Sequence, residues 1–205
     1  MKDTGARRLG NHAMIHLVLI LGAVAMVFPF YWVVCTSFKT NYEAISFPPT
    51  LFPREPVFSN YGKALAAAPF GRYFLNSVIQ AGGVSVGVLI TSILAAYAFA
   101  NMRFAGKNVI FTIVLATMMV PAEVTLIPNF VIIKKMGLYN TYLALILPFV
   151  GHVFSIFLLR QSFLNVPRDL YEAAAIDGCS HFRYLLDVML PLSIPGISVV
   201  GLLAF

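Results

Sequence analysis

Long apolar stretches alternate with shorter polar ones along most of the 205-residue chain. A helix that crosses a membrane needs about 20 mostly apolar residues. Stretches of this kind cover residues 14–38, 74–100, 108–127 and 141–163. A fifth apolar run, residues 192–205, has only about 14 residues at about 1.5 Å each, which is too few to cross. The pattern predicts an all-α, polytopic bundle of transmembrane helices.

The first apolar stretch follows a basic head that contains Lys2, Arg7 and Arg8. Residues 23–25 resemble a signal-peptide cleavage site, but the apolar character continues through residues 26–34. We therefore expect an uncleaved first span preceded by a cytoplasmic N-terminus, residues 1–13. The basic residues in the later connections favour this orientation only slightly.

The spans and their connections differ in character. Residues 74–100 are rich in Gly, Ala, Ser and Thr, which predicts close approach of neighbouring helices. The connection 39–72, here called the Pro-rich connection, cannot form one continuous helix, although Ser59 or Asn60 could begin a short one. The piece 125–137, which ends in two lysines and a glycine, suits a helix that lies at the membrane interface.

Composition excludes several classes of protein. Hydrophobic residues make up 60% of the chain and charged ones 11%, whereas a soluble domain has about 25% charged residues. Two cysteines cannot form a disulfide scaffold, and 18 Phe with 9 Tyr is not a disordered composition. The net charge of +6 is scattered between apolar stretches, so we expect lipid around the protein and no nucleic acid bound to it.

The polar segment 164–191 predicts two short helices. Pro167 suits the first position of a helix, and Gly178 suits a left-handed stop. Ser180 can cap a second helix from His181 to Leu190, which Pro191 would end. Helical spacing puts one set of residues on one side of the first helix: Leu170, Ala173, Ala174 and Asp177. The segment reads equally well as an amphipathic loop on the membrane surface or as a helix pair that projects toward a partner.

The same segment resembles the EAA loop of ABC importer permeases, and residues 164–191 are called the EAA segment below. The pattern of that loop is Glu-Ala-Ala, three residues, Gly, nine residues, an aliphatic residue, one residue, and Leu-Pro. This chain has the same order and spacing, with Val188 where the family more often has Ile. The matching positions are Glu172, Ala173, Ala174, Gly178, Val188, Leu190 and Pro191. Residues 28–39, 119–128 and 136–148 resemble the carbohydrate-uptake branch, in particular the second permease subunit of maltose-type and glycerol-3-phosphate importers.

The resemblance implies the type I importer permease fold, with about five of six spans present in residues 14–205 and the C-terminal part missing. It implies a multi-pass protein of the bacterial plasma (inner) membrane. The implied partners are ABC ATPase subunits, a second permease that forms a heterodimer, and an extracytoplasmic solute-binding protein. The solute would be a carbohydrate, with glycerol-3-phosphate as the alternative.

The resemblance also implies roles for residues of the EAA segment, which would form the coupling helix in a cleft of the ATPase. Glu172 would make a polar contact with the ATPase, Gly178 would set the turn beside Asp177, and Pro191 would mark the return to the membrane. The chain has no Gly-rich phosphate loop, so we expect a transporter subunit and not an enzyme, with ATP bound by the partner subunit and no cofactor or metal of its own.

Four polar residues within the apolar stretches are candidates for the translocation pathway. Asn76 and Gln80 lie four positions apart, so they could line a pathway or bridge two helices. Glu123 is an acid in an apolar run, but Pro121 beside it also fits an ordinary helix end in water. His152 has no metal-binding partner at a suitable spacing, which favours a packing or helix-bridging role.

Three further readings stay open at this point. A self-contained channel or secondary transporter would show two related halves, and no clear repeat is present. An intramembrane enzyme could use His152 and Ser155, which are three positions apart, but no acid nearby in the sequence would orient the histidine. The chain could also be a natural, non-transporting fragment.

Overall fold

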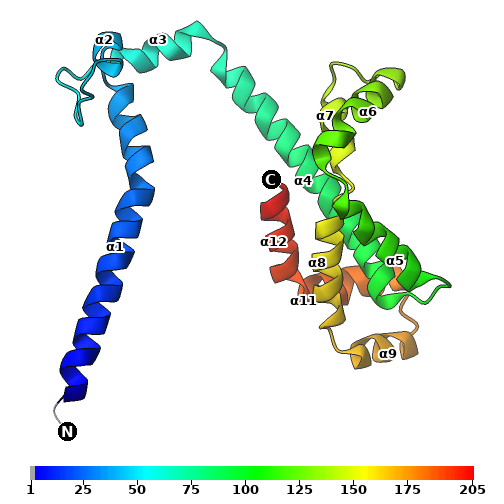
Figure 1. Cartoon of the computed structure of the whole chain (residues 1–205). Coiled ribbons are helices and arrows are strands. Elements are labelled where there is room, and N and C mark those ends of the chain that lie inside the picture. Colours follow the sequence, from blue (N-terminus) through cyan, green and yellow to red (C-terminus); the bar gives the residue numbers. More distant parts are fainter. Residues whose placement is uncertain (1–2) are drawn as a thin grey trace. The chain divides into compact units, whose positions relative to one another are not determined.

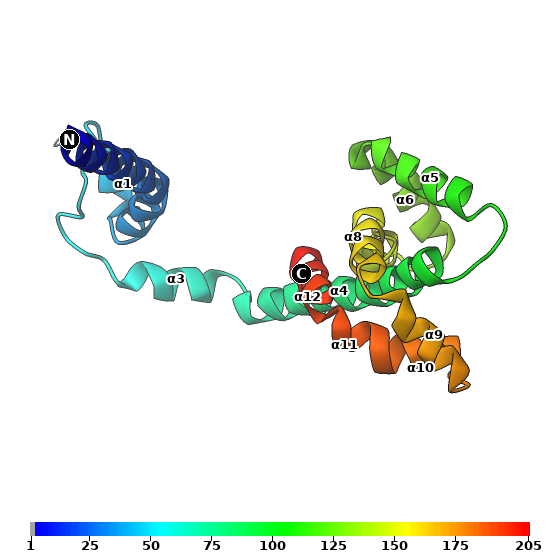
Figure 2. The same cartoon turned by 90° about the horizontal axis from the view of Figure 1, so that it is seen from below.

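The computed structural model describes residues 3–205, which form helices and connections and no strand. Met1 and Lys2, which begin the expected N-terminal segment 1–13, lie outside the described residues. The chain divides into two units, residues 1–71 and 72–205, and each is described by itself (Figures 1 and 2).

The first unit begins with one long helix, α1 (Asp3–Ser37), whose apolar part from Met14 to Ser37 is long enough to cross a membrane. Two short helices follow in the Pro-rich connection, α2 (Asn41–Ala44) and α3 (Ser59–Ala67). The helix start expected at Ser59 or Asn60 is confirmed, because α3 begins at Ser59.

The Pro-rich connection folds around the carboxylate of Glu43, which is 8% exposed. The carboxylate accepts hydrogen bonds from the Thr50 hydroxyl at 2.8 Å and from the Arg54 backbone N–H at 3.0 Å. The hydrogen bond from Thr50, helped by the N–H of Arg54 and the charge of Lys39, lowers the pKa of Glu43 below its ordinary value. The amide of Asn60 donates to the carbonyls of Ser37 and Lys39 at 3.0 and 2.9 Å.

The second unit is organised along α4 (Phe70–Asn101), a continuous helix long and apolar enough to span a membrane. A Cβ on Gly83 would lie 2.5 Å from Ile146, and a Cβ on Gly87 would lie 2.5 Å from Val150. One turn later the Thr91 hydroxyl donates to the carbonyl of Val150. The close approach predicted for this small-residue helix is confirmed.

The third apolar stretch does not form one helix over residues 108–127. Helix α5 (Lys107–Ala116) continues into a short 3₁₀ turn, η1 (Thr117–Met119), and Val120 is extended with ψ 116°. The reason is Pro121, whose ring disfavours helical backbone in the residue before it. Helix α6 (Ala122–Lys135) then includes Glu123 and continues through Pro128, so the second piece begins three residues earlier than expected.

The fourth stretch is also interrupted. Helix α7 (Tyr142–Ile146) and the 3₁₀ turn η2 (Leu147–Phe149) are separated from α8 (Val153–Leu164) by residues 150–152, with a bend of 51°. The break frees the carbonyl of Val150, which accepts the hydrogen bond from α4. Two continuous helices in the described chain could cross a membrane, or up to five if each bent pair is one span.

The core of the second unit lies where α4, α8 and the last helices meet (Figure 1). Its members are almost fully buried: Val88, Ala96, Tyr97, Leu159, Phe163, Tyr184, Leu185, Met189 and Val200. The last helices are α9 (Arg168–Ile176), α10 (His181–Tyr184), the π-helical turn η3 (Leu185–Met189), α11 (Leu190–Leu192) and α12 (Ile194–Ala204).

Candidate functional sites: the EAA segment and a polar cavity

The first helix of the EAA segment, α9, begins at Arg168, one residue later than predicted. Pro167 is extended, with ψ 133°, and occupies the capping position before the helix. The shift is small, and the proline still serves the helix start because its missing N–H would have had no partner in the first turn.

The end of α9 is a complete glycine stop. Gly178 has a φ of +73°, the left-handed region that the sequence predicted for it. The N–H of Gly178 donates to the carbonyl of Ala175 at 3.1 Å, and the N–H of Cys179 donates to the carbonyl of Ala174 at 2.9 Å. These two bonds are the Schellman pattern, which satisfies carbonyls that a helix end leaves free.

The second helix of the segment starts as predicted but ends later. The Ser180 hydroxyl accepts a hydrogen bond from the N–H of Arg183 at 3.3 Å, which confirms its capping role. The helical backbone then passes through Pro191 and ends at Leu192, so Pro191 does not stop it. A wider π turn precedes the proline, with the N–H of Leu190 bonded to the carbonyl of Leu185, and such turns accommodate local strain in a helix.

The predicted common face of α9 is divided in the structure. Ala174 packs against the core together with Tyr171, whereas Leu170, Ala173 and Asp177 are exposed. Ile176, beside the glycine stop, is 87% exposed. Exposed apolar side chains on a helix held at the edge of a fold are typical of a surface that a partner covers.

The charged groups of the segment lie at its surface. Arg168 and Glu172 are 3.6 Å apart, and Arg183 and Asp187 are 3.2 Å apart, each pair four positions apart on a helix. More than half of each of these side chains is exposed. Exposed pairs of this kind stabilise a fold by about 0–1 kcal/mol, so these charges remain available to another molecule.

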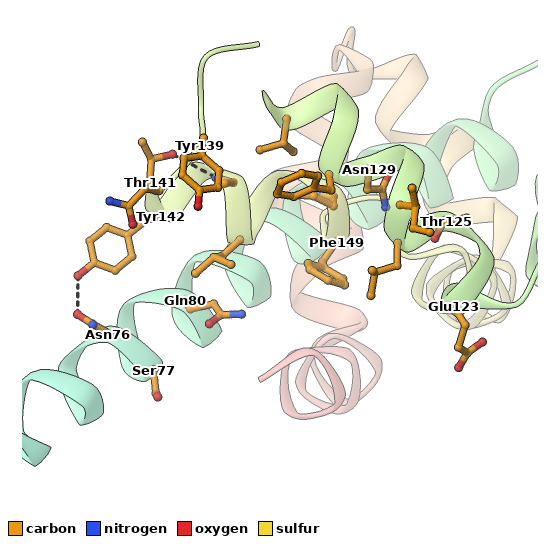
Figure 3. Close-up of a pocket in the computed structure, with 18 of the residues that line it drawn as sticks. Asn76, Ser77, Gln80, Glu123, Thr125, Asn129, Tyr139, Thr141, Tyr142 and Phe149 are labelled. Atoms are coloured by element: carbon orange, nitrogen blue, oxygen red, sulfur yellow. Dashed lines mark hydrogen bonds between the residues drawn. The ribbon is translucent and has the colours of Figure 1, made fainter. Parts of the chain in front are cut away.

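A second candidate site is a cavity of about 1190 Å³ between α4, α6 and α7 (Figure 3). Three of the four predicted pathway residues, Asn76, Gln80 and Glu123, line it. Sequence reasoning missed the other lining residues because they come from α6, α7, η2 and the connection 136–141, which are far from α4 in the sequence. They include Asn129, Phe130, Tyr139, Tyr142 and Phe149.

Some polar side chains that line the cavity form hydrogen bonds with each other, and others have no hydrogen-bonding partner among the described residues. The Tyr142 hydroxyl donates to the Asn76 side-chain oxygen at 2.7 Å, so Asn76 bridges α4 and α7 as well as lining the cavity (Figure 3). Within residues 3–205, the amides of Gln80 and Asn129 have no hydrogen-bonding partner. A site with free amides beside aromatic rings can bind a polar, largely uncharged molecule that has apolar ring faces.

Glu123 and His152 occupy more ordinary positions. Glu123 is in the first turn of α6, where a negative charge is favourable. His152 lines a smaller cavity of about 320 Å³, which Gln80 also lines, and its Nδ1 is 2.7 Å from the Ser155 hydroxyl. Ser155 is 1% exposed, so this pair holds the start of α8 and presents no accessible nucleophile.

Comparison with known proteins identifies the family. Residues 83–205, which include the EAA segment, match the model of the binding-protein-dependent transport system inner membrane component. The chain belongs to this family. Members of the family are components of transport systems of the inner membrane. The relatives that this chain resembles are permease subunits and not enzymes.

Two curated relatives and one solved structure extend the match over the whole chain. The chain is 37% identical over 94% of its length to the diacetylchitobiose uptake system permease protein NgcG of Streptomyces coelicolor. It is 34% identical over 97% of its length to the sn-glycerol-3-phosphate transport system permease protein UgpE of Pectobacterium atrosepticum. It spans 64% and 73% of the lengths of these two relatives.

One similar solved structure is a bacterial ABC transporter involved in the import of the acidic polysaccharide alginate, with a TM-score of 0.85 and 25% identity. The likeness covers 100% of this chain and 71% of the other. The fold is therefore that of an ABC importer permease, as the resemblance implied.

Proposed function

We propose that this chain is a permease subunit of an ATP-driven, binding-protein-dependent importer of carbohydrates, with its N-terminus in the cytoplasm. The observation that carries the proposal is the EAA segment. Its helix α9 is fixed by a glycine stop at one end and packs on the core through Tyr171 and Ala174. Its other side presents exposed apolar side chains, Leu170 and Ile176, and an exposed Arg168–Glu172 pair.

In this proposal α9 docks on an ATPase subunit of the importer, with Leu170 and Ile176 as apolar contacts and Glu172 as a polar one. When the ATPase subunits close around ATP, the EAA segment moves with the ATPase on which it docks. The helices that pack on the EAA segment then move as well. ATP is bound by the ATPase subunits. A second permease subunit and a solute-binding protein complete the assembly.

Co-purification from detergent-solubilised membranes tests the docking. The full-length protein is expressed with the ATPase subunit of the same importer, as wild type, Gly178→Pro and Gly137→Pro. Both glycines have a φ of +73° and open space around them, so proline strains both turns equally, but only Gly178 lies in the EAA segment. We expect the ATPase to be lost only with Gly178→Pro. Wild type that inserts and holds no ATPase would instead favour a self-contained channel or carrier.

The solute class is proposed from the cavity and the relatives together. Free amides beside aromatic rings fit a neutral oligosaccharide, and one relative is named for diacetylchitobiose uptake. Glycerol-3-phosphate is the second candidate, because Arg72 also lines the cavity and another relative is named for that solute. Uptake of each compound by proteoliposomes that contain the whole importer separates them. We expect diacetylchitobiose to be taken up, and uptake to fall in Gln80→Ala.

A further inference from the structure

An aromatic cluster joins α9 to the long helix α4. The ring of Tyr171 on α9 stacks on His181 of α10, with centroids 5.7 Å apart and planes at 23°. The same Tyr171 ring meets Tyr184 edge-on, at 5.2 Å and 82°. Tyr97 of α4 lies 6.5 Å from Tyr184, and its hydroxyl shares a hydrogen bond of 3.1 Å with Nδ1 of His181. These four residues are called the aromatic joint below.

The joint is buried where it meets the core and half-buried at Tyr171, where it meets α9. Tyr97 is 5% exposed and Tyr184 1%, and both belong to the core cluster. Helix α9 has no buried residue of its own, and it packs on that core through Tyr171 and Ala174. Aromatic pairs stabilise beyond their burial alone, and Tyr171 makes two of them, whereas Ala174 brings only a methyl group to the core.

The joint also connects α9 to the cavity, through α4. Helix α4 is continuous from Phe70 to Asn101 and carries Tyr97 near one end and the cavity residues Asn76, Ser77 and Gln80 near the other. About 20 residues at about 1.5 Å each separate these two groups, a distance of about 30 Å along the helix axis. A displacement of α9 that is passed to Tyr97 is therefore passed to the wall of the cavity.

We propose that Tyr97, Tyr171, His181 and Tyr184 are positioning residues that couple the movement of α9 to α4, and through α4 to the cavity. The proposal rests on the proposed function, because an ATPase must move α9. The competing route is the chain itself, in which α8 leads into α9 through residues 165–167.

The experiment measures how fast a cysteine at the cavity end of α4 reacts, in the parent protein and in variants of the aromatic joint. Cys35→Ser and Cys179→Ala remove the two cysteines of residues 1–205, any cysteine elsewhere in the protein is replaced as well, and Ser77→Cys adds one beside the cavity. The whole importer in lipid nanodiscs is treated with a polar maleimide, with and without ATP and vanadate. The joint variants are Tyr97→Phe, His181→Ala and the double variant. Tyr61→Phe is the matched control, because it removes one tyrosine hydroxyl that bonds to Ser37 at 2.7 Å, far along the sequence from the joint.

We expect ATP to change the labelling rate of Cys at position 77 severalfold in the parent and in Tyr61→Phe. The change should shrink in Tyr97→Phe, which loses the hydrogen bond to His181, and shrink further in His181→Ala, which also loses the stack on Tyr171, while ATP hydrolysis continues. The double variant should be no worse than His181→Ala, because both remove the same contact. A parent without any ATP-dependent change would overturn the proposed function. An ATP-dependent change that persists in every joint variant would overturn the joint alone and favour the route through α8.

Discussion

The Pro-rich connection buries two charged side chains, Lys39 and Glu43, whereas the EAA segment leaves its charged side chains exposed. In the first, Glu43 is 8% exposed and accepts hydrogen bonds from two residues of its own connection. In the second, Glu172 is paired only with Arg168 across 3.6 Å, and the side chains of both are more than 60% exposed. Both connections follow apolar helices and both contain short helices.

The difference shows what each connection requires to hold its shape. Buried polar groups need partners, and the Pro-rich connection supplies them within about 20 residues of chain. The EAA segment is held from beneath by the aromatic joint and from its end by Gly178. Its exposed groups are therefore unnecessary for its fold and available for a partner.

The largest expected effect is at Asn60, which closes the Pro-rich connection. Asn60→Ala removes two hydrogen bonds to the carbonyls of Ser37 and Lys39 and leaves these part-buried groups without that donor. We expect a local destabilisation of about 1–3 kcal/mol. Hydrogen exchange at the N–H of Val57, which bonds to Phe38, measures it. The same change at exposed Asn165 in the EAA segment should cost less than about 0.5 kcal/mol, and an equal cost there would contradict the comparison.

The next effect tests the glycine stop of the EAA segment. A side chain at position 178 meets no atom within 4 Å, so any cost comes from the backbone at φ +73°. We expect Gly178→Val to destabilise the segment by about 1–2 kcal/mol and Gly178→Asn by clearly less, because asparagine tolerates left-handed backbone. Gly62→Ala in α3 should instead stabilise by about 0.5–1 kcal/mol, since that glycine lies inside a helix with open space around it. Thermal unfolding in detergent compares the three, and equal losses at 178 would rule out the backbone explanation.

The sequence predicted those features that depend on neighbouring residues. The left-handed Gly178 and the cap at Ser180 are local, because each is decided by bonds within five residues. The break before Pro121 is also local, because the proline acts on the residue before it, although the apolar pattern alone predicts a span across it. The helix through Pro191 was not foreseen, because the π turn that permits it is formed against the buried core.

The candidate sites were harder to predict because they are assembled over long distances in the sequence. Asn76 and Gln80 were identified from their spacing, but Tyr142, which bonds to Asn76, is 66 positions away. Tyr97 and His181 are 84 positions apart, and no local pattern joins them. The hydrogen bonds of Glu43 span 7 and 11 positions, across prolines that hide any helical or strand period.

A smaller effect concerns the response of the Pro-rich connection to low pH, which depends on Glu43. The pKa of Glu43 is lower in the folded protein than its ordinary value. The ionised Glu43 therefore stabilises the fold at pH values above its ordinary pKa, and this contribution is lost as the pH falls from the ordinary pKa through the lower pKa of the folded state. We expect hydrogen exchange at the Arg54 N–H, corrected for intrinsic rates, to become faster over that range. Glu43→Gln should exchange faster at neutral pH and show no such acid step. An identical acid step in Glu43→Gln would assign the titration to another group.

The smallest effect on stability belongs to the exposed pair, and it is the most informative about function. Glu172→Gln removes one charge from a pair that is largely in water, so we expect a change in unfolding free energy of less than about 0.5 kcal/mol. If α9 docks on an ATPase, the same change should weaken co-purification of that ATPase, because a polar contact is lost at an interface from which water is excluded. Asp187→Asn, in the other exposed pair and outside α9, serves as the matched control and should keep the ATPase. Equal retention by both variants would show that Glu172 is a solvated surface charge, and would leave the apolar contacts of Leu170 and Ile176 to carry the docking.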